Sequence, residues 1–326
     1  MQYHIVAAVA VCLAAFLAPP ASAEDQPKCT LTRAANLDMT LDQAGRPVVP
    51  VSINGTKLSF VVDTAGIYTG VRQKTVDGLK LRTESLRNGL LLTLNGKKID
   101  TIAHADELLI GRLPIKDMSF MVWPQSHDAN DSDGTLAGEF LHLFDIEFDF
   151  AAAKFSLFLQ NDCGPRVVHW TSGPHGELPF EMNKTPMNTS MYIFNKSADW
   201  HIVARAKLDG VDVDATIDTG STMSFMTVED AADVLPQEMD EKNLKRLDSG
   251  DDPEHAIFTY PFKTLDFGDI RIDHPQIIMQ HRTDDGLSRR FQSRPQIILG
   301  TSALRQLHLY ISYKDRIIYF TNATAH

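Results

Sequence analysis

The sequence predicts an all-β-dominated fold with a few short helices, made of two duplicated halves. A short motif occurs twice, as VVDTAG at residues 61–66 and as TIDTGS at residues 216–221. Its aspartates, Asp63 and Asp218, lie 155 positions apart (218 minus 63). Solenoid repeats are only about 20–50 residues long, so this spacing indicates a duplicated domain. Each copy ends a run of alternating apolar and polar residues, the pattern of a half-buried strand.

The residues before each aspartate predict a β-hairpin. Apolar residues alternate on both sides of a tight-turn pair, which is Asn54-Gly55 in the first half and Asp209-Gly210 in the second. Both turn glycines precede their aspartates by eight positions (63 minus 55 and 218 minus 210). The alternating apolar residues are Val49, Val51, Ile53, Leu58, Phe60 and Val62 in the first half, and Ile202, Ala204, Ala206, Leu208, Val211, Val213, Ala215 and Ile217 in the second.

Two further anchors follow each aspartate in the same order. A strand, a turn glycine and a strand recur at residues 109–115 and 266–272. The tripeptide Leu136-Ala137-Gly138 matches Ile298-Leu299-Gly300, and each is followed by a short helical stretch. An aromatic-rich closing strand is then expected within residues 144–158 and 309–320. Because the anchors recur in one order, we expect two copies of one fold.

These motifs resemble those of the retropepsin-like and pepsin-like aspartic peptidases, and in particular bacterial periplasmic members with two retropepsin-like lobes. The resemblance runs from about Leu37 to Phe320 and implies a bilobal acid-protease fold of two duplicated retropepsin-like β-barrel lobes. Carried over by position, Asp63 and Asp218 would be the catalytic pair. The residues that would support the catalytic loops are Thr64, Ala65, Gly66, Thr219, Gly220, Ser221, Gly138 and Gly300.

The resemblance implies an aspartic endopeptidase that hydrolyses peptide bonds without a cofactor or a metal. Two carboxyls held about 3 Å apart cannot both ionise, so they share one proton. The carboxylate then takes a proton from a water that lies between the two groups, while the carboxylic acid polarises the scissile carbonyl. An extended polypeptide is the expected substrate, bound as an added strand. The aspartate-rich residues 128–134 are interpreted as a polar turn rather than a metal site.

The first loop departs from the family pattern at one position. Ala65 stands where the family has glycine, with Gly66 one place later. That glycine lets a backbone N–H approach the catalytic carboxylate, and an alanine can do so only if its φ is negative. Two functions therefore remain open: a working endopeptidase, or a catalytically inactive peptide-binding or structural periplasmic protein that retains the fold. In the second loop, the Ser221 hydroxyl is expected to bond the Asp218 carboxylate.

The N-terminus predicts export. An apolar run at residues 5–17, Pro19-Pro20 and the small-residue site Ala21-Ser22-Ala23 are typical of a signal peptide at residues 1–23. The run is too short to span a bilayer, so we expect a periplasmic or secreted protein without stable membrane insertion. The net charge of −11 and the lack of a basic stripe argue against nucleic acid as a partner.

The predicted domains are an N-terminal lobe at residues 24–160, an inter-lobe connection at 161–176 and a C-terminal lobe at 177–326. Since both lobes belong to one chain, we expect a complete site in a monomer. Cys29 precedes the first lobe and Cys163 follows its closing strand. In an oxidising compartment these two cysteines could form a disulfide, and the alternative is two unpaired buried thiols.

The family resemblance also implies a hairpin flap over the cleft. By position this flap lies between residues 85 and 102, around Asn95-Gly96, or in the second lobe between residues 247 and 261. The second half also has a longer insertion at residues 183–199, where the corresponding interval of the first half, residues 42–47, is only a few residues long. It is either a surface loop or part of a substrate groove.

Overall fold

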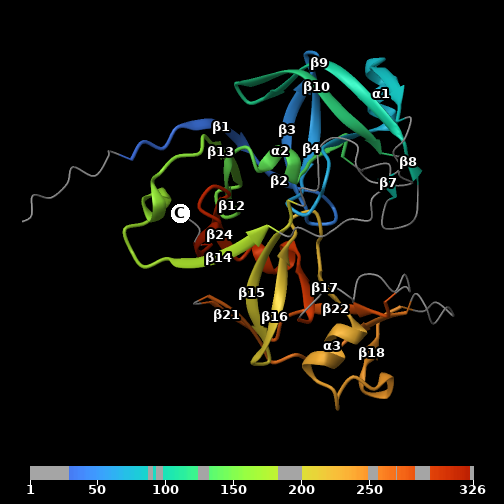
Figure 1. Ribbon diagram of the computed structural model, residues 1–326, viewed down its shortest axis with the longest axis vertical. Helices are drawn as coiled ribbons and strands as arrows, with labels where there is room; N and C mark the ends of the chain where they lie inside the picture. Colours follow the sequence, from blue (N-terminus) through green and yellow to red (C-terminus); the bar gives the residue numbers. More distant parts are fainter. Residues whose placement is uncertain are drawn as a thin grey trace, which may run out of the picture.

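The structure is a computed structural model that describes residues 29–86, 91–92, 98–123, 132–182, 200–248, 256–268, 270–282 and 294–323. Strands dominate it and the helices are short, which confirms the predicted fold class (Figure 1). The α-helices in these residues are α1 (Gln73–Leu79), α2 (Gly138–Leu141), α3 (Val228–Val234) and α4 (Thr301–Leu304). Within the described ranges, no helix has the length and apolar character needed to cross a membrane.

The strands divide between the two halves of the chain. Those of the first half are β1 (Arg33–Asp38), β2 (Thr40–Leu41), β3 (Pro47–Ile53), β4 (Thr56–Val62), β5 (Gly70–Arg72), β6 (Arg82–Ser85), β7 (Leu91–Leu92), β8 (Lys98–Ile99), β9 (Thr101–Ile110), β10 (Leu113–Trp123), β11 (Gly134–Leu136), β12 (Asp145–Asp149) and β13 (Lys154–Phe158). Those of the second half are β14 (Gly176–Met182), β15 (Ile202–Leu208), β16 (Val211–Ile217), β17 (Ser224–Thr227), β18 (Lys245–Arg246), β19 (Ile257–Thr259), β20 (Thr264–Phe267), β21 (Ile270–Asp273), β22 (Ile277–Gln280), β23 (Gln296–Leu299), β24 (Leu307–Ser312) and β25 (Ile317–Asn322).

The first lobe is a closed barrel. Its strands follow the order β3-β4-β11-β5-β10-β9, and β9 pairs back with β3. The predicted hairpin is β3 and β4, and its turn residues Asn54 and Gly55 have φ values of 48° and 80°. Positive φ at both positions is what a two-residue hairpin turn requires. The alternation seen in the sequence therefore places Val49, Val51 and Ile53 in the core.

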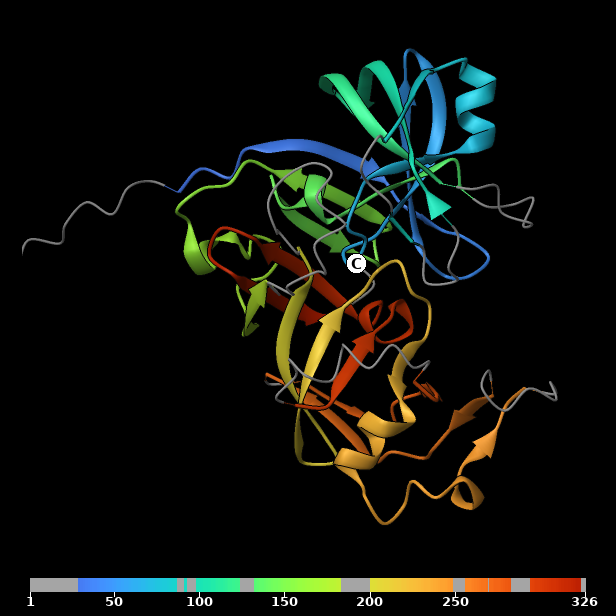
Figure 2. The same ribbon diagram turned by 45° about the vertical axis from the view of Figure 1, so that its right-hand side comes forward.

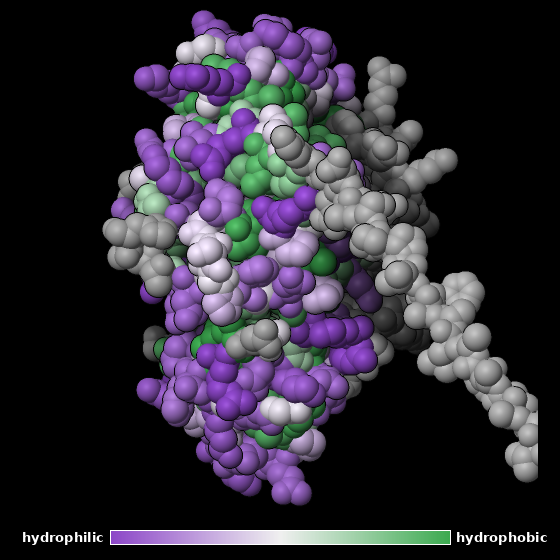
Figure 3. Space-filling model, turned by 90° about the vertical axis from the view of Figure 1, so that its left-hand side faces the viewer, coloured by the Kyte–Doolittle hydropathy of each residue, from purple (hydrophilic) through white to green (hydrophobic). Residues whose placement is uncertain are grey.

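The second lobe repeats this hairpin as β15 and β16, with φ values of 48° at Asp209 and 85° at Gly210. Its sheet continues from β16 through β23, β17, β22 and β19 to β18. The two lobes lie at opposite ends of the molecule, with strands of both halves between them (Figure 2). On the face in Figure 3, hydrophilic side chains predominate, while the large apolar side chains of the strands are buried.

A central sheet joins the two halves. It runs in the order β1-β13-β12-β24-β25-β14, and β12 of the first half pairs antiparallel with β24 of the second. The sequence predicted one closing strand in each half, and this was wrong. Each closing segment is a hairpin, β12 with β13 and β24 with β25, because a tight turn divides it. In the first of these turns Ala153 has a φ of 53°.

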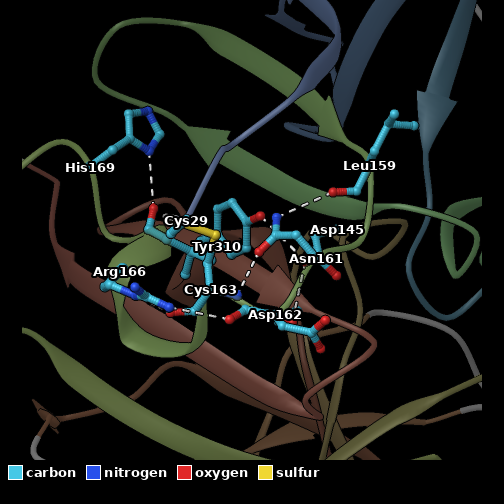
Figure 4. The surroundings of a disulfide bond; sticks show 11 residues. Cys29, Asp145, Leu159, Asn161, Asp162, Cys163, Arg166, His169 and Tyr310 are labelled. Atoms are coloured by element: carbon cyan, nitrogen blue, oxygen red, sulfur yellow. Dashed lines mark hydrogen bonds between the residues drawn. A yellow bond between two sulfur atoms is a disulfide. The ribbon is translucent and has the colours of Figure 1, made fainter. Parts of the chain in front are cut away.

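A disulfide joins Cys29 and Cys163, which are 134 positions apart in the sequence (Figure 4). Cys163 is buried in a small apolar cluster with Phe158 of β13 and Tyr310 of β24. The bond therefore links the segment before β1 to the connection after β13, next to the central sheet.

Several sequence predictions fall on residues outside the described ranges. These are the signal peptide at 1–23, residues 128–131 of the polar turn, the insertion at 183–199, the Asn95-Gly96 turn and residues 249–255 of the second possible flap. The strands beside both possible flaps are described, and each pair is antiparallel: β7 with β8, and β18 with β19.

Candidate active site

The two motif loops meet at the interface of the lobes and are bonded to each other through Thr64 and Thr219. The backbone N–H of Thr64 donates to Thr219 Oγ1 at 3.1 Å, and the N–H of Thr219 donates to Thr64 Oγ1 at 3.1 Å. Each hydroxyl also crosses the interface as a donor, from Thr64 to the Ile217 carbonyl at 2.7 Å and from Thr219 to the Val62 carbonyl at 2.6 Å. Both threonines are fully buried, so these bonds fix the loops relative to each other.

Each aspartate accepts two backbone hydrogen bonds from its own loop. Asp63 Oδ1 accepts from the N–H groups of Ala65 at 3.1 Å and Gly66 at 2.7 Å. Asp218 Oδ1 accepts from Gly220 at 2.8 Å and Ser221 at 3.0 Å. The alanine of the first loop therefore keeps the bond that a glycine makes in the second.

The backbone explains why Ala65 is tolerated. Ala65 is not among the residues with positive φ, so its conformation is open to any L-amino acid. The condition that the sequence set for this loop, a negative φ at Ala65, is met. The Ser221 expectation was wrong, because the Ser221 hydroxyl donates to the Met223 carbonyl at 3.0 Å and its backbone N–H bonds Asp218 instead.

The Asp63 carboxyl lies against the loop of the other lobe. A Cβ atom at Gly220 would lie 2.3 Å from Asp63 Cγ and 2.5 Å from its Oδ1. Gly220 follows Asp218 by two residues, so this contact brings the two aspartates into one site. The glycine is required here by close approach and not by an unusual φ.

The two carboxyls interact electrostatically. The pKa of Asp218 is raised to about 7, mainly by burial and secondly by the negative charge of Asp63. Burial also raises the pKa of Asp63, against the lowering effect of the N–H bonds from Gly66 and Ala65. Neighbouring carboxyls of this kind hold a proton as a pair.

The segments beneath the loops hold them in place, but their sequence alignment was one residue out of register. The Leu136 carbonyl accepts a hydrogen bond from the Asp63 N–H at 2.9 Å, and the Leu299 carbonyl accepts one from the Asp218 N–H at 3.0 Å. Gly138 therefore corresponds to Thr301 and not to Gly300. Accordingly, the Gly138 N–H donates to the Gly66 carbonyl at 2.8 Å, and the Thr301 N–H donates to the Ser221 carbonyl at 2.9 Å. The glycine match was misleading because the two halves place glycine differently.

This register explains the order Ala65-Gly66 in the first loop. A Cβ atom at Gly66 would lie 3.0 Å from the Cβ of Ala137 and 2.8 Å from Asp63 Oδ2. In the second lobe the equivalent positions are Ser221 and Gly300. Each lobe thus has one glycine at this contact, on the loop in the first lobe and beneath it in the second.

Two residues just before β15 extend to the loops of the first lobe, and neither was predicted from the sequence. Trp200 stacks on His142 at the end of α2, with ring centroids 3.5 Å apart. A Cβ atom at Gly138 would lie 2.7 Å from Trp200 Cβ, so the tryptophan covers that glycine. His201 Nε2 donates to the Ala65 carbonyl at 2.5 Å.

The sequence also did not predict Glu139, which lies on α2 directly after Gly138. Its Oε1 accepts from the Thr69 N–H at 2.5 Å, and its buried Oε2 has no hydrogen-bond partner. Burial raises the pKa of Glu139 to about 7. Within the described part of the chain, no group of three or more His, Cys, Asp or Glu side chains could hold a metal ion.

Two duplicated β-lobes that each supply an aspartate to one interlocked pair of loops define a protein of the aspartic protease class. The sequence profile of the aspartyl protease family matches residues 49–140 and residues 204–303, once in each half. The chain therefore belongs to the aspartyl protease family, in its two-lobed retropepsin-like form. A search of curated proteins finds no match.

Proposed function

We propose that the protein is an aspartic endopeptidase whose catalytic pair is Asp63 and Asp218. The observation that carries this proposal is the contact of the Asp63 carboxyl with Gly220, in the loop of Asp218. The reciprocal bonds of Thr64 and Thr219 support it, because they fix both loops before substrate arrives.

The pair would act on a water held between the two carboxyls. With one shared proton, the ionised carboxyl takes a proton from the water and the protonated carboxyl donates to the scissile carbonyl oxygen. Attack forms a tetrahedral diol, and proton transfer to the amide nitrogen then releases the two peptide products. Burial and the charge of Asp63 raise the pKa of Asp218. The pair therefore stays singly protonated at pH values well above those at which a carboxyl group ordinarily loses its proton.

The proposed substrate is an extended polypeptide, and the proposed compartment is the periplasm or the exterior of the cell. The disulfide between Cys29 and Cys163 supports an oxidising compartment, and the apolar run at residues 5–17 supports export. One chain supplies both aspartates, so the proposed active form is a monomer. Sedimentation of the active species and N-terminal sequencing of the exported protein would test these two points; a dimer or an intact residue 1 would contradict them.

The decisive experiment is cleavage of a peptide library by the purified chain from residue 24, from about pH 3 to 8, beside Asp63→Asn and Asp218→Asn. We expect each substitution to abolish cleavage while the protein remains folded, because one carboxylate and one acid are both needed. Cleavage that survives both substitutions would refute the assignment. A folded parent that binds peptides without cleaving them would show an inactive binding protein.

A further inference from the structure

The first observation is that the two halves place a basic residue at the same position. Arg46 directly precedes β3 and His201 directly precedes β15, and they are separated by 155 positions (201 minus 46), as Asp63 and Asp218 are. The Arg46 side chain bonds Asp42 within its own turn, Nε to Oδ2 at 2.7 Å. His201 instead bonds across the lobe interface to the loop of Asp63.

The second observation is that this bond ends on the peptide group that holds Asp63. The Ala65 carbonyl, which accepts from His201 Nε2 at 2.5 Å, belongs to the same peptide unit as the Gly66 N–H. That N–H donates to Asp63 Oδ1 at 2.7 Å. A donor on the carbonyl oxygen polarises the amide and strengthens its N–H as a donor. The chain of contacts therefore runs from the imidazole through one peptide group to the candidate catalytic carboxylate.

The third observation concerns charge. His201 lowers the pKa of both Asp63 and Asp218 through its positive charge, although burial is the larger, opposing effect on each. Arg46 also lowers the pKa of Asp63. Two further titratable groups lie in this region: His142 stacks on Trp200, the residue before His201, and the buried Tyr313 hydroxyl interacts with Asp63, whose charge, after burial, raises the pKa of Tyr313.

We propose that His201 is a positioning residue that makes the candidate catalytic pair sensitive to pH: its imidazolium bonds the Ala65-Gly66 peptide and stabilises the ionised Asp63. This inference rests on the proposed function. Arg46 keeps its charge at every relevant pH, whereas a histidine ordinarily loses its charge between about pH 5 and 8. The duplicated position thus holds one permanent and one titratable cation.

The expected sign follows from the charge. Activity at low pH is lost when the remaining carboxylate of the pair becomes protonated, and a nearby cation opposes that protonation. Replacing His201 by a neutral donor should therefore move the acidic limb of the kcat/KM profile to higher pH, by about 0.5 to 1 pH unit. Losing the hydrogen bond as well should lower kcat at every pH.

The test compares His201→Gln, which keeps an N–H donor without the charge, with His201→Leu, which keeps neither. Full kcat/KM profiles from pH 3 to 8 are measured for both, beside His175→Gln as the control. His175 lies before β14 and is paired with Glu177 at 3.5 Å. We expect the limb shift in both His201 variants, a further fall in kcat of about 5-fold in His201→Leu, and the parent profile in His175→Gln.

Unchanged acidic limbs in both His201 variants would overturn the proposal. So would a loss of kcat in His201→Leu without any limb shift in His201→Gln, which would show a purely structural bond. A second readout needs no activity: by reciprocity, Asp63→Asn should move the NMR titration midpoint of the His201 ring to lower pH. If the parent cleaves nothing, the proposed function fails, and this midpoint still decides whether His201 and Asp63 are coupled.

Discussion

The carboxyl group of Asp63 lies against the Cα atom of Gly220, leaving no space for a side chain there. Ala65, at the equivalent position of the other loop, carries a methyl group and still bonds Asp63 through its N–H. The two aspartates are therefore in unequal surroundings, although the loops are related by duplication. Unequal surroundings give two neighbouring carboxyls different pKa values.

We predict opposite outcomes for substitutions at these equivalent positions. Gly220→Ala should lower kcat/KM by about 100-fold or more, because the new Cβ atom displaces the Asp63 carboxyl from its position. Ala65→Gly should leave kcat/KM within about 3-fold of the parent and cost about 0.5 to 1 kcal/mol of unfolding free energy, through backbone entropy. Steady-state kinetics and urea unfolding measure both. A large gain in activity on Ala65→Gly would show that the alanine impairs the site.

The paired threonines should be critical for stability as well as activity. Thr64→Val leaves the buried Ile217 carbonyl without its donor and the Thr219 N–H without its acceptor. We expect a loss of about 2 to 5 kcal/mol in unfolding free energy, with a large fall in kcat. Thr64→Ser retains the hydroxyl and is the matched control, expected to cost only about 1 kcal/mol for the lost methyl group. Equal losses in the two variants would contradict the role of the hydrogen bonds.

Stability should fall as the pH rises from about 4.5 to 7. Burial raises the pKa of Glu139 from 4.5 to about 7, so over this range the folded state holds a proton that the unfolded state has released. More protons on the folded state mean that unfolding free energy decreases with pH. Between pH 4.5 and pH 8, the unfolding free energy of Glu139→Gln should therefore fall by on the order of 3 kcal/mol less than that of the parent.

The control for this experiment is Glu181→Gln, at an exposed position of β14. It should follow the parent curve at every pH. Asp145, buried in the central sheet, has a pKa raised to about 6 by burial and should contribute a slope of the same sign. A Glu139→Gln protein with the same pH dependence as the parent would rule out Glu139 as a source.

The disulfide should stabilise the fold without taking part in the chemistry. A bond between residues 134 positions apart restricts the unfolded chain and is worth about 5 kcal/mol in the chain-entropy model. The double variant Cys29→Ser with Cys163→Ser should lose up to this amount in chemical unfolding and retain its kcat at 25 °C. Reductant should destabilise the parent and leave the double variant unchanged. Destabilisation of both proteins by reductant would point to another cause.

Local patterns made much of the structure predictable. The hairpins before Asp63 and Asp218 followed from alternating side chains and from turn pairs that tolerate positive φ, properties of neighbouring residues. The closing segments were harder, because their apolar residues continue across the turn and conceal it. The register of the supporting segments was missed because glycine was aligned with glycine. At the contact between the loop and its supporting segment, the first lobe has its glycine on the loop and the second lobe has it on the supporting segment.

The sequence by itself determined that the chain is duplicated, that each half ends a hairpin on an aspartate, and that one loop has alanine in place of glycine. These features depend on short stretches of chain, whose conformational preferences act locally. Only the tertiary structure decided that Asp63 lies against Gly220 and that His201 bonds the Ala65 carbonyl. Both contacts cross between the lobes, where the pairing of β12 with β24 and the packing of buried side chains set the distances.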